Sequence, residues 1–390
     1  VPHLRFPEFS GEWEMVSLQD IATINPKSDP LQNTFIYIDL EAVEKGELRK
    51  IQEIMREEAP SRAQRVIDNN DILFQCVRPY QKNNYIHRIL NTSNQQWVAS
   101  TGYAQIRTTE LPNYIYHLLN TDEFNRKVMV RCTGSSYPAI NSEDLATIHL
   151  YYTPDKKEQL KISRLLDLLD KRIATQNKII EDLKKLKSAI SKHLFARKDL
   201  LETTICLSNI ATLKNGYAFQ SGKYNALGKW KILTITNVSG ERYINDEDYN
   251  CIINLPNDIQ DHQVLKEGDI LISLTGNVGR VSLCKDGDYL LNQRVGLLQL
   301  AKNVNQEFLY QILSSQRFEN SMIACGQGAA QMNIGKGDVE SYVLPYSSNV
   351  NNILLVAKIL HSYDEYIINE QRKLTLLTMQ KQYFLAQMFI

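Results

Sequence analysis

No stretch of this 390-residue sequence approaches the run of about 18 apolar residues that a membrane-spanning helix needs, and its first residues lack the apolar core of a signal peptide. The six cysteines lie far apart and include no CxxC pair. Such a distribution favours reduced, packed thiols over disulfides or zinc ligands. We therefore expect a cytoplasmic protein that makes no contact with a membrane.

Motifs of catalysis are missing as well. The sequence has no G-x-x-x-x-G-K-[ST] phosphate loop, because Gly335-Lys336 lacks the preceding glycine spacing. The seven histidines include no H-E-x-x-H pair, so we expect no metal site. No Asn/Asp-Pro-Pro-aromatic segment, which holds a flipped adenine in amino-methyltransferases, is present. These absences argue against an enzyme that acts alone, although a site can be assembled from scattered residues.

The chain also has no excess of charge, since 44 basic residues balance 44 acidic ones. Neutrality speaks against a nucleic-acid binder that relies on its own positive charge. The distribution is less even, because 156–199 contains 13 basic and 6 acidic residues, a net charge of +7, whereas 351–390 has a net charge of +1. Such a run is most often the solvated face of a helix. If the chain does bind DNA, partner subunits would supply part of the charge that neutralises phosphates.

What the sequence does contain is a long internal repeat. Residues 134–195 and 328–389 match without a gap at a fixed offset of 194, and each segment ends in a ladder of apolar residues spaced alternately by three and four. The first ladder consists of Leu166, Leu169, Ile173, Ile180, Leu183, Ile190 and Leu194. The second ladder consists of Leu360, Tyr363, Ile367, Leu374, Leu377, Phe384 and Met388. This spacing is the pattern of a coiled-coil seam.

Polar residues interrupt the two ladders at the same positions, Gln176 and Lys187 in the first and Glu370 and Lys381 in the second. Polar seam residues lower stability but can fix the register of two helices. The two stripes can bury each other, and a helix over about 158–195 would be roughly 55 Å long. The ladders therefore predict a matched pair of long helices.

The repeat continues upstream with drifting offsets. Asp71-Ile72-Leu73 matches Asp269-Ile270-Leu271 at an offset of 198, and Leu18-Gln19-Asp20-Ile21 matches Leu207-Ser208-Asn209-Ile210 at 189. Two amphipathic helices in any long chain can be aligned by chance, but ordered matches at the start of each half argue against chance. The offsets indicate insertions within two modules and none within the helices.

Each module alternates strand-like and helical segments. Runs rich in β-branched or aromatic residues predict strands at 35–38, 72–74, 232–235 and 270–274, and a helical segment follows near 112–130 and 305–322. We expect mixed α/β (α+β) modules in tandem, separated by two long helices. The expected segments are module 1 at 1–155, helix 1 at 156–198, module 2 at 199–350 and helix 2 at 351–390.

Several polar loops of these modules have side chains suited to reading DNA. Asn and Gln pair with adenine edges, Arg pairs with guanine, and Ser and Lys bind phosphates. The candidates in module 1 are Arg78, Tyr80, Gln81, Lys82, Asn83, Asn84, Ser135, Ser136 and Tyr137. The candidates in module 2 are Asn277, Arg280, Asn292, Gln293, Arg294, Gln327, Gln331 and Asn333. For any single residue, an ordinary turn remains the alternative.

The order of these features resembles the specificity subunit of type I restriction–modification systems over nearly the whole chain. The likeness rests on the opening Leu4-Arg5-Phe6-Pro7-Glu8-Phe9 with Trp13 and Leu18, on Ser100-Thr101-Gly102-Tyr103-Ala104, on the module end at 134–150 and on both helices. Module 2 departs from module 1, because Asn292-Gln293-Arg294-Val295-Gly296 replaces the Ser100–Ala104 segment. The two modules need not read the same bases.

The resemblance implies a non-catalytic DNA-recognition subunit. Each module would be a target recognition domain that reads one half of a split, asymmetric sequence in double-stranded DNA, and the helices would form an antiparallel coiled coil that sets the spacing. Two methyltransferase subunits would dock on the chain and methylate adenine N6 with S-adenosylmethionine, and motor-nuclease restriction subunits would join them. This chain itself would bind no cofactor.

The alternatives are a stand-alone modification enzyme, which needs a cofactor pocket, and a coiled-coil scaffold or RNA-binding protein, which would show no preference for a defined DNA duplex.

Overall fold

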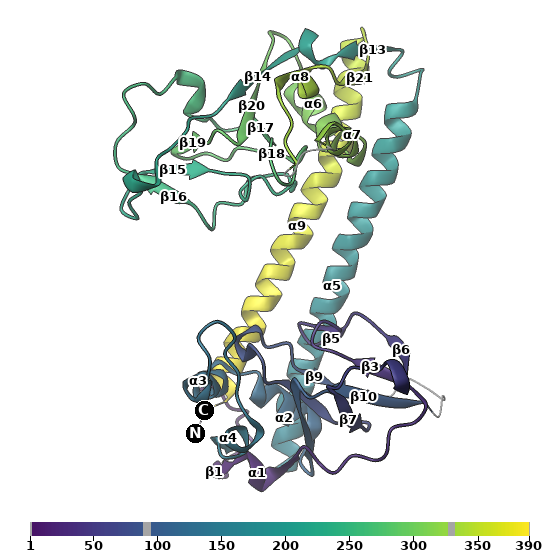
Figure 1. Ribbon diagram of the computed structural model, residues 1–390, viewed down its shortest axis with the longest axis vertical. Coiled ribbons are helices and arrows are strands. Elements are labelled where there is room, and N and C mark those ends of the chain that lie inside the picture. Colours follow the sequence, from purple (N-terminus) through teal and green to yellow (C-terminus); the bar gives the residue numbers. More distant parts are fainter. Residues whose placement is uncertain (1, 89–94, 327–331, 390) are drawn as a thin grey trace. The chain divides into compact units, whose positions relative to one another are not determined.

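The structure is a computed structural model, and it describes residues 2–88, 95–326 and 332–389 (Figure 1). The chain folds into two compact units. The first unit comprises Val1–Asn177 with Lys373–Ile390, and the second comprises Lys178–Arg372. Each unit therefore contains one module together with part of each long helix.

The first unit contains two four-stranded sheets, with strand orders β6-β3-β10-β7 and β2-β11-β8-β9, and the small pairs β1-β12 and β4-β5. Within the first of these sheets β3 and β10 are parallel. The strands of the first unit are β1 (Glu14–Ser17), β2 (Ala22–Ile24), β3 (Thr34–Ile38), β4 (Val43–Glu44), β5 (Glu47–Leu48), β6 (Gln52–Met55), β7 (Ala63–Ile67), β8 (Ile72–Gln75), β9 (Tyr85–Ile86), β10 (Gln96–Ser100), β11 (Tyr103–Thr108) and β12 (His149–Tyr152). Its short helices are α1 (Leu18–Ile21), α2 (Pro112–Leu119), α3 (Asp122–Arg131) and α4 (Ser142–Ala146).

The second unit repeats this plan with a three-stranded sheet, β16-β15-β19, a four-stranded sheet, β14-β20-β17-β18, and the pair β13-β21. Here β15 and β19 are the parallel pair. Its strands are β13 (Thr203–Cys206), β14 (Ala211–Asn215), β15 (Trp230–Leu233), β16 (Asn250–Ile252), β17 (Ile270–Ser273), β18 (Val281–Leu283), β19 (Tyr289–Leu291), β20 (Val295–Leu300) and β21 (Val343–Tyr346). Its short helices are α6 (Gln306–Leu313), α7 (Gln316–Gly326) and α8 (Lys336–Glu340). The matching strand orders confirm the prediction of tandem mixed α/β modules.

Two details of the sequence prediction were wrong. The helical segments expected near 112–130 and 305–322 are each two helices, because Thr121 accepts a hydrogen bond from the amide of Phe124 and starts a new helix, and Ser315 occupies the equivalent break before α7. The strand expected at 232–235 ends at Leu233. Its successor Thr234 enters a turn, in which its amide donates to the side chain of Asn237 over 2.7 Å.

The long helices are α5 (Lys156–Ala196) and α9 (Val350–Met388), coloured teal and yellow in Figure 1. In the first unit the start of α5 and the end of α9 share one hydrophobic core, through Leu166 and Leu377 among others. In the second unit the end of α5 and the start of α9 share another, through Leu194 and Leu360. The helices are therefore antiparallel within each unit. Each of the fourteen ladder residues is buried or half-buried.

Two polar interruptions of the ladders form ion pairs between the helices. Lys187 binds Asp364 over 2.5 Å in the second unit, and Lys381 binds Asp170 over 2.5 Å in the first. The two pairs are equivalent under the 194-residue repeat. A charged residue on a seam is stable only in a register that places it beside a counter-ion. These pairs therefore fix the register of α5 against α9 within each unit.

His87 is an isolated polar group in the core of the first unit. Its side chain is fully buried between Tyr85 and Trp97, and within the described part of the chain neither ring nitrogen has a hydrogen-bond partner. Burial lowers the pKa of His87 to about 4. The folded chain therefore holds this imidazole in its neutral form.

This burial predicts a pH dependence. Because the folded pKa lies below the unfolded value of about 6.5, the unfolded chain binds more protons between these values, and stability is complete above pH 6.5 and falls towards pH 4. The loss attributable to His87 is about 3 kcal/mol. We expect His87→Phe to be more stable than the wild type at pH 5 and to flatten the dependence, which urea unfolding at several pH values measures. An unchanged pH profile in the variant would contradict this role.

Candidate nucleic-acid interface

In the first unit, three polar loops meet where β8 ends. The amide of Cys76 donates to the carbonyl oxygen of Gly102 over 3.0 Å, and the carbonyl oxygen of Cys76 accepts from the amide of Ile140 over 3.1 Å. The amide of Arg78 donates to the carbonyl oxygen of Pro138 over 2.7 Å. We call residues 77–84, 100–103 and 133–139 the first loop cluster. Burial raises the pKa of the Cys76 thiol to about 12, so Cys76 is a neutral packing group at the centre of the cluster.

The second unit repeats the same three bonds. Leu274 donates through its amide to Arg294 over 3.0 Å and accepts through its carbonyl oxygen from Ile334 over 2.9 Å, and the amide of Gly276 donates to Met332 over 3.0 Å. Residues 275–280, 292–295 and 332–333 form the second loop cluster. Each of these residues is the repeat equivalent of its counterpart around Cys76. The fold therefore assembles loops that the sequence analysis could only identify one by one.

Arg78 and Tyr137 are in contact in the first loop cluster, Arg78 half-buried and Tyr137 exposed. The guanidinium carbon of Arg78 lies 4.3 Å from the centroid of the Tyr137 ring, which is 64% exposed. Arg78 has a backbone φ of +55°, a left-handed conformation that costs a non-glycine residue about 1–2 kcal/mol. Its equivalent in the second cluster is Gly276, with a φ of +69°. The first cluster thus has an arginine where the second has the residue that adopts this conformation without strain.

Other candidates of the first cluster divide into exposed and engaged side chains. Tyr80, Ser135 and Ser136 are exposed. Lys82 binds Asp122 over 2.5 Å, and Asn83 accepts a hydrogen bond from the amide of Lys45 over 3.0 Å. These contacts hold the 77–84 loop, and Tyr80, Ser135 and Ser136 are candidates of the cluster whose side chains are exposed.

Asn84 is an internal residue. It is 2% exposed, its side-chain oxygen accepts from the amide of Gln75 over 2.8 Å, and its side-chain nitrogen donates to Asn120 over 3.1 Å. Both ends of this amide are thus used within the unit. Asn84 positions the loop and presents no group to a ligand.

Gln75, which the sequence analysis missed, organises the same loop. It is 2% exposed, and its side-chain nitrogen donates to Gln81 over 2.9 Å while its side-chain oxygen accepts from the amide of Asn83 over 3.1 Å. The available signal was a glutamine at the end of the apolar strand 72–74. A polar residue that continues an apolar strand is buried with it and has to find partners inside.

In the second loop cluster Asn277, Gln293, Arg294 and Asn333 are exposed. Asn292 is half-buried, and its side-chain oxygen accepts from the amide of Arg294 over 3.1 Å, which shapes the turn. Gln327 and Gln331, also candidates, lie outside the described residues.

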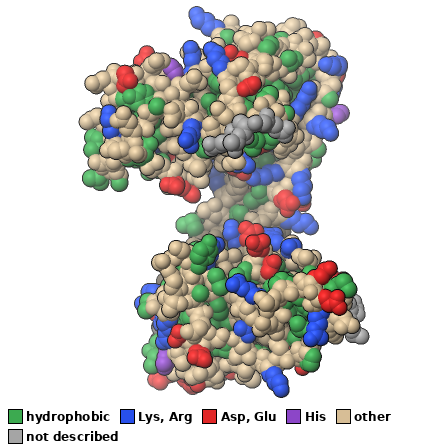
Figure 2. All heavy atoms as spheres, viewed as in Figure 1, with side chains coloured by type: hydrophobic (Ala, Val, Ile, Leu, Met, Phe, Trp, Pro, Cys, Tyr) green, Lys and Arg blue, Asp and Glu red, His purple; other side chains and the backbone are tan. Residues whose placement is uncertain are grey.

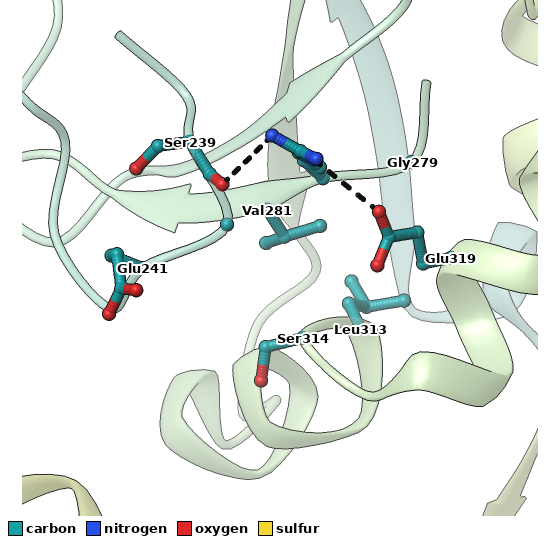
Figure 3. A pocket seen from close by; sticks show the side chains of 9 residues that line it. Ser239, Glu241, Gly279, Val281, Leu313, Ser314 and Glu319 are labelled. Atoms are coloured by element: carbon teal, nitrogen blue, oxygen red, sulfur yellow. Dashed lines mark hydrogen bonds and ion pairs between the residues drawn. The ribbon is translucent and has the colours of Figure 1, made fainter. Parts of the chain in front are cut away.

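Arg280 lies at a polar cavity of about 220 Å³ in the second unit (Figure 3). Its guanidinium reaches Glu319 over 3.4 Å and the carbonyl oxygen of Ser239 over 3.5 Å, and its side chain is 39% exposed. Both contacts are long. Arg280 is therefore weakly held and accessible, at one side of the loop cluster.

The basic run at 156–199 is partly paired. At least six of its 13 lysines and arginines form ion pairs, among them Lys184 with Glu241 over 2.7 Å and Lys185 with Glu181 over 2.6 Å. On the described residues of the face drawn in Figure 2, Lys and Arg are interspersed with Asp and Glu in each unit and form no continuous basic surface. The charge distribution matches the solvated-face interpretation better than a phosphate-binding track.

The described residues contain no group of three or more His, Cys, Asp or Glu side chains arranged to hold a metal ion. No helix within the same residues is both long enough and apolar enough to cross a membrane.

Comparison with known proteins identifies the modules. The model of the type I restriction modification DNA specificity domain matches residues 10–185 and again residues 202–379. The chain belongs to the type I restriction–modification DNA specificity family. These two matches make it a DNA-recognition subunit, not a catalytic one, and confirm the resemblance read from the sequence.

Individual relatives of this specificity subunit agree. The MjaVIII specificity subunit of Methanocaldococcus jannaschii is 25% identical over 360 residues, which cover 82% of this chain and 78% of the relative. The crystal structure of the type I S subunit from M. genitalium has a TM-score of 0.59 at 15% identity, covering 100% of this chain and 99% of that one. A chain from a structure that describes complex assembly and conformational transition of the type I R-M system also has a TM-score of 0.59, at 19% identity and 98% coverage of both chains. These structures share the fold of this specificity subunit.

Proposed function

We propose that each loop cluster reads one half of a split, asymmetric sequence in double-stranded DNA. The observation that carries this proposal is the repeated set of hydrogen bonds around Cys76 and Leu274, because it presents two sets of loops on one framework. The side chains on that framework differ. Arg78 and Tyr137 belong to the first cluster, and Gly276 and Arg294 belong to the second. Two readers with one framework and different side chains suit a target with two unlike halves.

The proposal gives the helices the role of setting the distance between the half-sites. Both helices are continuous between the units, and their seams carry ion pairs that fix the register. The chain would recruit two adenine-N6 methyltransferase subunits and the restriction subunits. S-adenosylmethionine would bind to the methyltransferase and not to this chain.

Methylation-sensitive long-read sequencing tests the function. A host that expresses this chain with its cognate methyltransferase should acquire adenine methylation at a split motif, and the methylation should disappear when the chain is deleted. Methylation at a continuous motif, or methylation that survives without the chain, would contradict the proposal.

The spacing role predicts the outcome of a paired deletion. Removing 175–181 from α5 and the equivalent 369–375 from α9 takes one heptad from each helix and preserves the alternation of the ladders. One heptad is about 10 Å of helix, or about 3 base pairs of DNA. We expect the half-sites to stay the same and the spacer to shorten by about 3 base pairs, as measured by methylation mapping.

A matched control removes 175–181 alone, which mismatches the two helices and should abolish methylation. If the paired deletion alters the bases of either half-site, the helices do not act as a ruler.

A further inference from the structure

Arg65 lies beside the first loop cluster and belonged to none of the candidate loops. It is on β7, where it stands opposite Ala99 of β10, the strand that leads into the turn at 100–103. Side chains alternate along a strand, so Arg65 shares a face with Ile67. Ile67 packs with Leu73 and Tyr103 between the two sheets of the unit. The Arg65 side chain therefore extends into the space that ends at the loop cluster.

Among the described residues, the Arg65 guanidinium forms no ion pair. The side chain is half-buried, and its Nε atom is buried with no hydrogen-bond partner among the described residues. Burial lowers the pKa of Arg65, and the group that opposes this effect is the thiol of Cys76 at the centre of the cluster. A desolvated cation without an acceptor is costly, and folded proteins normally pair it.

The equivalent position of the second unit is occupied by a residue with a structural role. The strand pairing of Val264 with Leu290 corresponds to that of Val66 with Val98, so Gln263 is the counterpart of Arg65. Gln263 is 7% exposed, and its side-chain oxygen accepts from the amide of Gln260 over 2.9 Å. A neutral, internally bonded side chain thus satisfies the framework, and the arginine of the first unit is not required by it.

We infer that Arg65 is a DNA-contacting residue of the first module, and that its guanidinium binds an acceptor supplied by the DNA, either a phosphate oxygen or the O6/N7 edge of a guanine. Both acceptors match the planar fork of arginine. This inference rests on the proposed function. It adds a difference between the two modules, because Arg65 would contact the first half-site only.

The test uses the complex of the full chain with its methyltransferase and the variants Arg65→Gln and Arg65→Lys. Arg65→Gln installs the side chain of the second unit, so we expect the melting temperature to stay the same or rise. DNA affinity is expected to fall roughly tenfold to a hundredfold. Methylation mapping of the wild-type complex comes first and should show a split motif. The lack of a split motif there would contradict the proposed function, whereas the Arg65 variants test the inference about Arg65.

The variants distinguish the two acceptors. For a guanine edge, Arg65→Gln relaxes one base of the first half-site in methylation maps, and Arg65→Lys fails to restore it. If the acceptor is a phosphate, Arg65→Gln leaves the motif unchanged and reduces the slope of log affinity against log salt concentration by about one. Arg65→Lys then restores most of the binding.

The matched control is Arg126→Gln, which removes the same charge from an exposed arginine paired with Glu123 on α3. We expect it to change neither motif nor affinity. Two results would overturn the inference. One is an Arg65→Gln complex with unchanged affinity and motif, and the other is a variant whose affinity loss accompanies a clear fall in melting temperature.

Discussion

Replacing Asp364 by asparagine is expected to lower the free energy of unfolding of the second unit by about 3 kcal/mol. Asp364 is 6% exposed and accepts hydrogen bonds from Lys187 over 2.5 Å, from Arg242 over 2.9 Å and from Gln311 over 2.6 Å. Removing its charge leaves Arg242 with the carboxylate of Glu307 and takes from Lys187, whose side chain is 17% exposed, the carboxylate that it binds. The cost of an uncompensated buried charge is what makes the effect large.

The repeat supplies a control with the same chemistry. Asp170 occupies the equivalent position of α5 and, within the described residues, forms an ion pair with Lys381 only; the side chains of Asp170 and Lys381 are 35% and 21% exposed. Asp170→Asn should therefore cost less than about 1 kcal/mol. Urea unfolding measures both variants, with hydrogen exchange of the β8 and β11 amides to report on the first unit and of the β14 and β20 amides to report on the second. Equal effects at the two positions would show that burial of the network does not determine its strength.

The second large effect concerns Arg78. We expect Arg78→Gly to weaken DNA binding by the complex roughly fivefold to a hundredfold while changing the free energy of unfolding by less than about 1 kcal/mol. Glycine removes the left-handed strain, which offsets the lost contact with Tyr137 and the greater freedom of the unfolded chain. In this variant the DNA affinity should therefore fall while the free energy of unfolding stays nearly the same.

Titration of labelled duplex DNA and thermal unfolding measure the two quantities. Arg78→Lys keeps the charge and loses the planar fork, so it should recover part of the affinity if the contact is electrostatic and little if it reads a base. A parallel loss of binding and stability in Arg78→Gly would assign Arg78 a structural role instead.

The sequence was sufficient for features set by local periodicity or by the repeat. The ladders predicted helix 1 at 156–198, and α5 covers Lys156–Ala196. The matching of Asp71-Ile72-Leu73 with Asp269-Ile270-Leu271 identified β8 and β17 as counterparts. Both signals depend on residues close together in the chain.

Features created by distant residues were not visible. Asn84 looks like a loop residue in the sequence, yet Asn120, at the end of α2, covers it. The bonds of Cys76 to Gly102 and Ile140 that assemble the first loop cluster join three separate segments. Arg65 belongs to no motif, and its lack of a counter-ion in the described part of the chain becomes apparent only once β7 is placed against β10. Pairings of this kind are decided by tertiary packing, which a single sequence does not encode locally.

The central claim is that each module reads its own half-site, and exchanging one module tests it most directly. Residues 14–152 would be replaced by the corresponding module of another specificity subunit, and adenine methylation would be mapped by long-read sequencing for the wild-type and hybrid chains with the same methyltransferase. The account predicts a split motif in both strains, with one half changed in the hybrid and the other half and the spacer kept. A hybrid that changes both halves, or neither, would contradict it.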